Sequence, residues 1–136
     1  MNAPIDPKAA VRAWISKAEA DFNAARVLLA SGKDCPAHIV CFHAQQCVEK
    51  YLKAVLCHRG VDFPRIHDIG ELASLLPDGV APGLSAEEQE QLTEYAVDSR
   101  YPGLEREIDF EETARTAKCM EKARSALRSS FPKDLL

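Results

Sequence analysis

The strongest constraint on the fold is a spacing that recurs three times in the second half of the chain. At each place a side chain that accepts hydrogen bonds stands three residues before a glutamate. The pairs are Asp68 with Glu71, Ser85 with Glu88, and Asp109 with Glu112. This spacing is the capping box, in which both side chains bind free N–H groups at the start of a helix. It predicts a short helix that ends before Pro77, a second that runs to residues 98–102, and a third that continues to about residue 127.

The first half of the chain carries two longer helical patterns. Asp6 and Pro7 combine a cap with a proline at the first helical position, and apolar residues then recur at helical spacing as far as Gly32. A second apolar stripe begins at residues 34–36 and continues to Gly60. The sequence shows no alternating strand pattern, internal repeat or low-complexity tract. We therefore predict one all-α domain over residues 1–136, an up-and-down bundle of four main helices plus a short one, with an irregular third connection.

Hydropathy and cysteine content indicate a cytoplasmic protein. No run approaches the ~18 apolar residues that a membrane span requires, and the first ten residues lack the basic and apolar regions of a signal peptide. The five cysteines show neither a CxxC pair nor a disulfide pattern, so we expect reduced, structural thiols. Cys41, His43 and Cys47 lack the second ligand pair that a zinc site usually takes from a separate segment. We therefore expect no metal or other cofactor.

The net charge of −4 argues against indiscriminate nucleic-acid binding, which requires a clearly basic domain. Charge is nevertheless segregated along the chain. Acidic residues dominate residues 84–109, whereas basic residues gather at 50–67 and at 115–128. Such runs are either solvated helix faces or, where cations converge, a local anion site.

A polar stripe runs along the otherwise apolar second helix. Its members are spaced by three, four and three residues, which places them on one helix face. They are His43, Gln46, Lys50 and Lys53. One interpretation is a solvated face with a weak surface pair between Glu49 and Lys53. The other interpretation is the lining of a groove or an interface.

Two further candidates stand at helix ends. His67 immediately precedes a helix cap, where a histidine either hydrogen-bonds an anion held by the free N–H groups or is a plain surface residue. Arg100 lies at the end of the fourth predicted helix, because Pro102 disfavours the helical conformation at Tyr101. An arginine there either neutralises the helix end or, oriented by Asp98, binds a phosphate through two hydrogen bonds.

Three motifs in order resemble the prokaryotic HEPN domain. They are FHAQQCVEKYLKAVLCHRG (residues 42–60), HDIGEL (67–72) and YAVDSRYPG (95–103), preceded by a first helix that contains Trp14. Their order and spacing match the family from about residue 11 to residue 127, which we take as the core of the domain. The resemblance implies a helical bundle that forms a homodimer. It also implies a gene commonly placed beside a minimal nucleotidyltransferase, as one half of a toxin–antitoxin or nucleotide-handling pair.

The sequence departs from the nuclease branches of that family at one motif. HEPN RNases use an arginine and, after four to six intervening residues, a histidine, paired across the dimer. The nearest pair here, Arg59 and His67, is one residue too long, and the position six beyond Arg100 is Arg106 rather than the tyrosine of another branch. The chain therefore lacks a histidine at the position of the usual base for metal-free RNA cleavage. Anion binding, by contrast, needs only cations and hydrogen-bond donors.

These observations favour a binding module. We expect a homodimer that binds a nucleotide or RNA, a nucleotidyltransferase-domain partner, or both. The expected ligand contacts are Arg100, Tyr101, Asp98, His67, Lys50, Lys53 and Gln46. The first alternative is a divergent metal-independent RNase toxin, in which Arg100 acts with His67 or His58. The second alternative is a structural helical adaptor.

Overall fold

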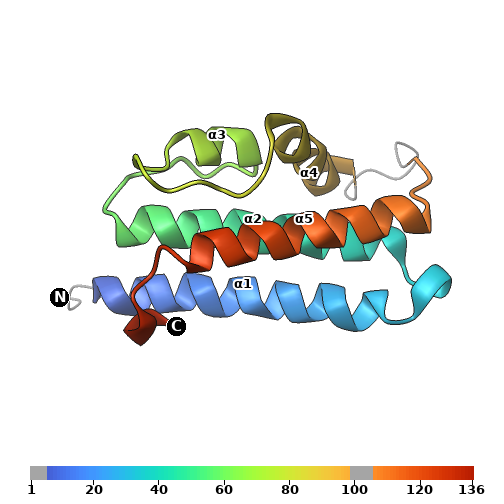
Figure 1. The fold of residues 1–136 in the computed structure, drawn as a ribbon, viewed down its shortest axis with the longest axis horizontal. Coiled ribbons are helices and arrows are strands. Elements are labelled where there is room, and N and C mark those ends of the chain that lie inside the picture. The colour runs from blue at the N-terminus through green and yellow to red at the C-terminus, as the bar shows by residue number, and fades with distance from the viewer. Residues whose placement is uncertain (1–5, 99–105) are drawn as a thin grey trace.

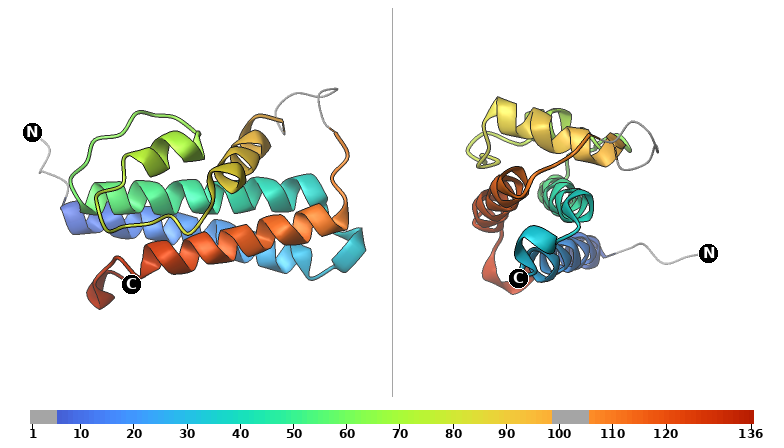
Figure 2. Two further views of the ribbon diagram at one scale, coloured as in Figure 1. Left: turned by 45° about the horizontal axis from the view of Figure 1, so that its top comes forward. Right: turned by 90° about the vertical axis from the view of Figure 1, so that its right-hand side faces the viewer.

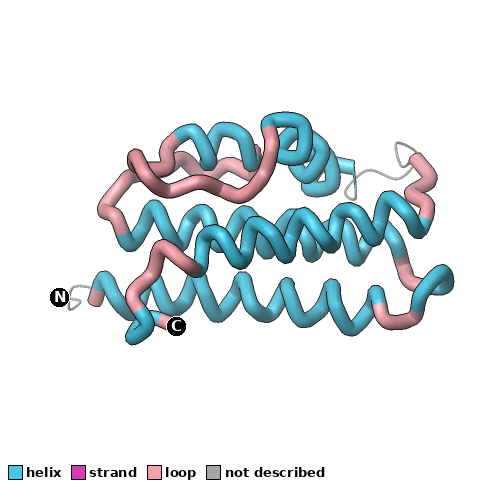
Figure 3. The backbone as a smooth tube through the Cα atoms, viewed as in Figure 1, coloured by secondary structure: helices cyan, strands magenta, loops and turns pink. Residues whose placement is uncertain are grey.

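The protein is helical throughout the part that the structure describes. The computed structural model describes residues 6–98 and 106–136, and these ranges contain helices and loops but no strand (Figure 3). The α-helices are α1 (Pro7–Leu29), α2 (Ala37–His58), α3 (Ile69–Ser74), α4 (Ala86–Asp98) and α5 (Phe110–Arg128). The predicted all-α class and the order of the helices are confirmed. Two 3₁₀ turns that the sequence does not predict, η1 (Gly32–Asp34) and η2 (Lys133–Leu135), follow α1 and α5.

Helix α2 lies at the centre of the bundle. The three long helices α1, α2 and α5 run side by side, and α3 and α4 lie over α2 on the side away from α1 (Figure 1). All the other α-helices pack against α2, and α1 forms the most extensive interface with it. Helix α4 is inclined to the long helices (Figure 2). Helix α4, the third of the four main helices, therefore crosses the bundle obliquely.

The helices begin at the caps that the sequence predicts. Each aspartate cap accepts a hydrogen bond from a backbone N–H: Asp6 from Lys8 (3.0 Å), Asp68 from Glu71 (2.9 Å) and Asp109 from Glu112 (2.8 Å). Ser85 and Glu88 bind reciprocally, because the N–H of Ser85 donates to Glu88 Oε1 at 2.9 Å and the N–H of Glu88 donates to Ser85 Oγ at 3.1 Å. Local capping therefore sets the starts of α1, α3, α4 and α5.

Glu19 of α1 fastens the three long helices together. Its two carboxylate oxygens accept hydrogen bonds from Arg124 of α5 at 2.7 and 2.6 Å. Tyr51 of α2 donates a third bond at 2.6 Å and accepts one from Arg128 at 2.9 Å. The Arg124 guanidinium also lies 4.2 Å from the centroid of the Phe22 ring, a favourable cation–π position.

The segment that leads into α4 passes close to α5 at Gly83. This residue has a φ of +76°, and a Cβ placed on it would lie 2.8 Å from the Cβ of Ala126 and 3.0 Å from the carbonyl oxygen of Lys122. Glycine meets both the conformational and the steric requirement. The start of α4 is therefore held beside the second half of α5.

The cysteines pack in and around the core. All five are free, and Cys41 and Cys47 have no exposed surface. Burial raises the pKa of Cys41 to about 11 and also raises the pKa of Cys47, so both thiols stay protonated at neutral pH. Within residues 6–98 and 106–136, no group of three His, Cys, Asp or Glu side chains is placed to hold a metal ion. None of the described helices is both long and apolar enough to cross a membrane.

Candidate functional site

A buried carboxylate organises the polar stripe of α2. The side chain of Glu49 is 4% exposed, and its Oε2 accepts a hydrogen bond from Nζ of Lys53 at 3.2 Å. Its Oε1 accepts one from Nε2 of Gln45 at 3.1 Å and lies 2.8 Å from Nδ1 of His67. Gln46 extends the chain by donating to Oε1 of Gln45 at 2.6 Å. We call these five residues the Glu49 network. Their donors and cations offset the cost of burying the Glu49 charge.

Lys53 is enclosed by the protein. Its side chain is 8% exposed, and its ammonium lies 5.6 Å from the centroid of the Trp14 ring and 6.0 Å from that of Phe63. The two rings meet edge to face at 6.2 Å. The interpretation of Glu49 and Lys53 as a surface pair is therefore wrong, because the pair is buried and the rings of Trp14 and Phe63 lie over the Lys53 ammonium. The Lys53 charge is already engaged by a carboxylate and two aromatic faces.

A second carboxylate holds the other lysine of the stripe. Asp21 of α1 places its Oδ1 2.8 Å from Nδ1 of His43, and its Oδ2 accepts a hydrogen bond from Nζ of Lys50 at 2.5 Å. Asp21 is buried, whereas the side chains of His43 and Lys50 are 27% and 22% exposed. We call these three residues the Asp21 cluster. It ties α1 to α2 and gives the Lys50 ammonium a counter-charge.

The structure brings three of the predicted ligand residues into one network. Gln46, Lys53 and His67 all belong to the Glu49 network, whereas Lys50 belongs to the Asp21 cluster. His58, the alternative base, ends α2 and has its ring 5.6 Å from that of Phe131. It is not a member of the Glu49 network.

The remaining predicted residues stand at the end of α4 or follow it in the sequence. Asp98 is the last residue of α4, and its side chain is not described. Arg100 and Tyr101 lie outside the described residues. Their roles as ligand contacts stay predictions.

Asp21 is the polar partner that sequence reasoning missed, whereas Gln45 forms a row at four-residue spacing with Glu49 and Lys53. Gln45 stands four residues before Glu49, so the spacing that joins them is visible in the sequence. Asp21 gives no comparable signal, because its partners His43 and Lys50 are 22 and 29 residues away. Only the packing of α1 on α2 brings them together.

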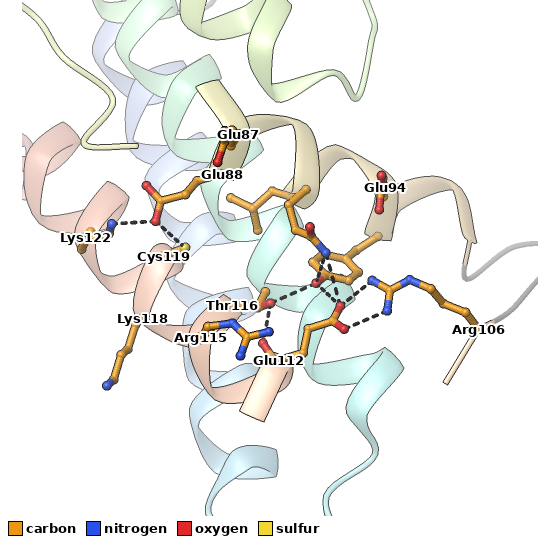
Figure 4. A pocket seen from close by; sticks show the side chains of 13 residues that line it. Glu87, Glu88, Glu94, Arg106, Glu112, Arg115, Thr116, Lys118, Cys119 and Lys122 are labelled. Carbon is orange, nitrogen blue, oxygen red and sulfur yellow. Dashed lines mark hydrogen bonds and ion pairs between the residues drawn. The ribbon is translucent and has the colours of Figure 1, made fainter. Parts of the chain in front are cut away.

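A cleft of about 790 Å³ lies between α4 and α5 (Figure 4). Its charged lining comprises Glu87, Glu88, Glu94, Glu112, Arg106, Arg115, Lys118 and Lys122. Two nearly buried hydroxyls also line it: the Tyr95 hydroxyl donates to Oε2 of Glu112 at 2.6 Å and accepts a hydrogen bond from Thr116 at 3.1 Å. Glu112 is the glutamate of the third predicted capping box, and its side chain turns into the cleft.

Ion pairs neutralise half of the charged groups in this cleft. Arg106 binds both oxygens of Glu112, at 2.7 and 2.5 Å, and this contact is the main cause of the lowered pKa of Glu112. Lys122 donates a hydrogen bond to Glu88 at 2.7 Å. This bond is the main cause of the lowered pKa of Glu88, which is about 2. Both carboxylates are therefore ionised at neutral pH.

The Tyr95 hydroxyl and the Cys119 thiol, which both line the cleft, are held protonated. The pKa of Tyr95 is raised to about 12 and that of Cys119 to about 11, and burial is the main cause of both shifts. Cys119 also donates its thiol proton to Glu88, with Sγ 3.1 Å from the carboxylate oxygen. A thiol reacts as the thiolate, so this cleft is suited to binding and not to covalent catalysis through Cys119.

Comparison with known proteins places the chain in one family. The HEPN domain family matches residues 11–130. The crystal structure of TT1696 from Thermus thermophilus superposes with a TM-score of 0.73 and 23% sequence identity, over 89% of this chain and 98% of that one. A search among curated proteins gave no match.

A second solved structure agrees in both sequence and fold. The crystal structure of ST0689, an archaeal HEPN homologue, is 31% identical and superposes with a TM-score of 0.59, over 88% of this chain and 93% of that one. The match to the family covers most of the helical core and includes all three motifs that suggested it. The chain belongs to the HEPN domain family.

Proposed function

We propose that this protein is a binding module that recognises a nucleotidyltransferase-domain partner, a nucleotide, or both, as one half of a toxin–antitoxin-like pair. The observation that carries the proposal is the Glu49 network. The members of this network that reach the surface, Gln46 and His67, are held in place by hydrogen bonds to Gln45 and Glu49, so a partner that binds these two side chains loses little side-chain entropy on association.

The charge state of the polar stripe supports recognition over RNA cleavage. Metal-free cleavage needs cationic donors for the charge that develops on the phosphate. Lys50 and Lys53 instead pair with Asp21 and Glu49 at 2.5 and 3.2 Å. Neither lysine carries an unshared charge for that purpose.

We further propose that Arg100 contacts the bound anion with Tyr101, and that Asp98 orients the guanidinium. A guanidinium binds phosphate through two parallel hydrogen bonds, which an ammonium does not reproduce. Arg100→Lys should therefore weaken nucleotide binding by about 1–3 kcal/mol while the fold is kept. Equal affinities of wild type and Arg100→Lys in calorimetric titration would rule out the two-pronged contact.

One observation favours the RNase alternative. The Glu49 carboxylate holds Nδ1 of His67 at 2.8 Å, which fixes the orientation of the imidazole as acid–base catalysis requires. RNA cleavage by purified protein without metal, lost in both His67→Asn and Arg100→Ala, would favour this alternative.

Co-purification from the native host tests the proposal directly. Mass spectrometry of the bound material should identify a nucleotidyltransferase-domain protein, a nucleotide, or both. Recovery of neither, together with no RNA cleavage, would leave the structural adaptor as the function.

A further inference from the structure

Helix α4 is attached to α5 across the cleft by side chains and not by close packing of the two helices. It packs on α2 and α3, and the cleft of about 790 Å³ lies between it and α5 (Figure 4). Within residues 6–98 and 106–136, every hydrogen bond that joins the two helices runs between side chains. The attachment of α4 to α5 therefore depends on a few polar groups.

The amino-terminal end of α4 is held at a fixed place on α5. Lys122 and Cys119 both donate hydrogen bonds to Oε2 of Glu88, at 2.7 and 3.1 Å. Gly83, just before the helix, lies so close to Ala126 that a Cβ on the glycine would be 2.8 Å from the alanine Cβ. This end of α4 is therefore a point about which the rest of the helix can turn.

The carboxyl-terminal half of α4 is attached to α5 mainly at one atom. Oε2 of Glu112 accepts hydrogen bonds from the Tyr95 hydroxyl at 2.6 Å and from Nε2 of Gln91 at 3.3 Å. The same oxygen accepts a bond from Arg106, which precedes α5 (Figure 4). Thr116 provides one more link, to the Tyr95 hydroxyl at 3.1 Å. That link is weakened because the single proton of the Thr116 hydroxyl is also shared with the carbonyl oxygen of Glu112, at 2.9 Å.

Few buried side chains hold α4 against the rest of the bundle. Among residues 86–96, whose side chains are described, the buried ones are Leu92, Tyr95 and Ala96. Helix α2, by contrast, buries side chains along its whole length. A segment with few buried apolar contacts opens at a lower free energy than the core does. We therefore expect α4 to open more readily than α2.

We propose that Glu112 is a releasable latch, and that the carboxyl-terminal half of α4 swings away from α5 when the latch opens, while α1, α2 and α5 stay packed. The movement turns on the fixed end at Gly83 and Glu88. It widens the cleft and exposes the hydroxyls of Tyr95 and Thr116, which are nearly buried in the closed form. One carboxylate therefore controls access to the cleft.

Hydrogen exchange of the full chain, followed by mass spectrometry at neutral pH, tests the inference. Glu112→Ala removes both bonds from α4 to the carboxylate, and Tyr95→Phe removes the hydroxyl while it keeps the ring. Each variant should speed the exchange of the α4 amides at least tenfold, about the effect of one hydrogen bond to a charged group. The exchange of the α2 amides should not change. Glu111→Ala, which alters an exposed glutamate in the same turn of α5, is the matched control and should exchange as wild type does.

Three results would overturn the inference. If neither variant changes the exchange of α4, Glu112 is not the latch. Equal acceleration in α2 and α4 would mean that α4 opens only when the whole bundle unfolds. An effect of Glu112→Ala without one of Tyr95→Phe would show that the Tyr95 bond does not close the latch. Circular dichroism melting of each variant verifies that it is folded.

Discussion

At the scale of single residues, the ion pairs of the three long helices make stability depend on pH. The hydrogen bond from Arg124 is the main cause of the lowered pKa of Glu19, whose ordinary value is 4.5, and the bond from Tyr51 acts in the same direction. The folded pKa is below the unfolded one. The stabilisation is therefore complete when the pH is above the ordinary pKa of 4.5, and it is lost as the pH falls through the pKa of the folded state.

Glu19→Gln should make unfolding less sensitive to acid. At pH 7 we expect a loss of about 1–3 kcal/mol, because Arg124 loses a charged partner. Below about pH 4.5 the wild type loses this stabilisation as Glu19 is protonated, so the two proteins should converge. Urea unfolding of both proteins across this range measures the difference. If the difference in the free energy of unfolding between the two proteins stays constant down to about pH 2, the ion pair of Glu19 is not the source of the pH dependence.

The two lysines of the α2 stripe should differ in their effect on stability. Lys53→Met leaves the Glu49 carboxylate buried without its ammonium, so we expect a loss of about 3–5 kcal/mol. Lys50→Met should cost less, because Lys50 is more exposed. Adding Glu49→Gln to Lys53→Met should recover much of the loss. Chemical denaturation measures all four proteins. Equal losses for the two lysine variants would show that burial does not distinguish the pairs.

At the scale of helices, local chemistry explains what the sequence predicts and what it does not. Caps such as Ser85 with Glu88 join residues three apart, so they are visible before any fold is known. The bond of His67 to Glu49 spans 18 residues, and the bond of Glu112 to Tyr95 spans 17. Those partners are selected by how α2, α4 and α5 pack. The stripe of α2 and the pairing of Glu49 with Lys53 were therefore predictable, whereas the bonds to Asp21 and His67 and the cleft were not.

The close approach of the α4 lead-in to α5 gives a test at this scale. Gly79 and Gly83 both have positive φ, of +87° and +76°, but a Cβ on Gly79 would meet no atom within 4 Å. Gly79→Ala should therefore cost only the conformational strain, about 1–2 kcal/mol. Gly83→Ala should cost clearly more, because its Cβ also meets Ala126. Thermal melting compares the two, and equal losses would show that α5 yields to the added methyl group.

At the scale of the whole molecule, we expect two copies to associate. The resemblance to the HEPN domain implies a homodimer, and the large apolar side chains of Val27 and Ile39 are 72% and 50% exposed. Burying such groups between two copies removes apolar surface from water. Light scattering at micromolar concentration should give twice the 15.0 kDa of one chain. A particle of the mass of one chain would refute the dimer.

The central position of α2 has a consequence for synthesis on the ribosome. Helices α1 and α2 emerge first and are joined by a short connection, so they can pair early through contacts close in sequence. Phe63 and His67, which cover Lys53 and bind Glu49, are translated only afterwards. During that interval the pair of Glu49 and Lys53 on the nascent helical hairpin is exposed to water. The arrival of the segment after α2 seals it, so dehydration of this pair becomes a late step of folding.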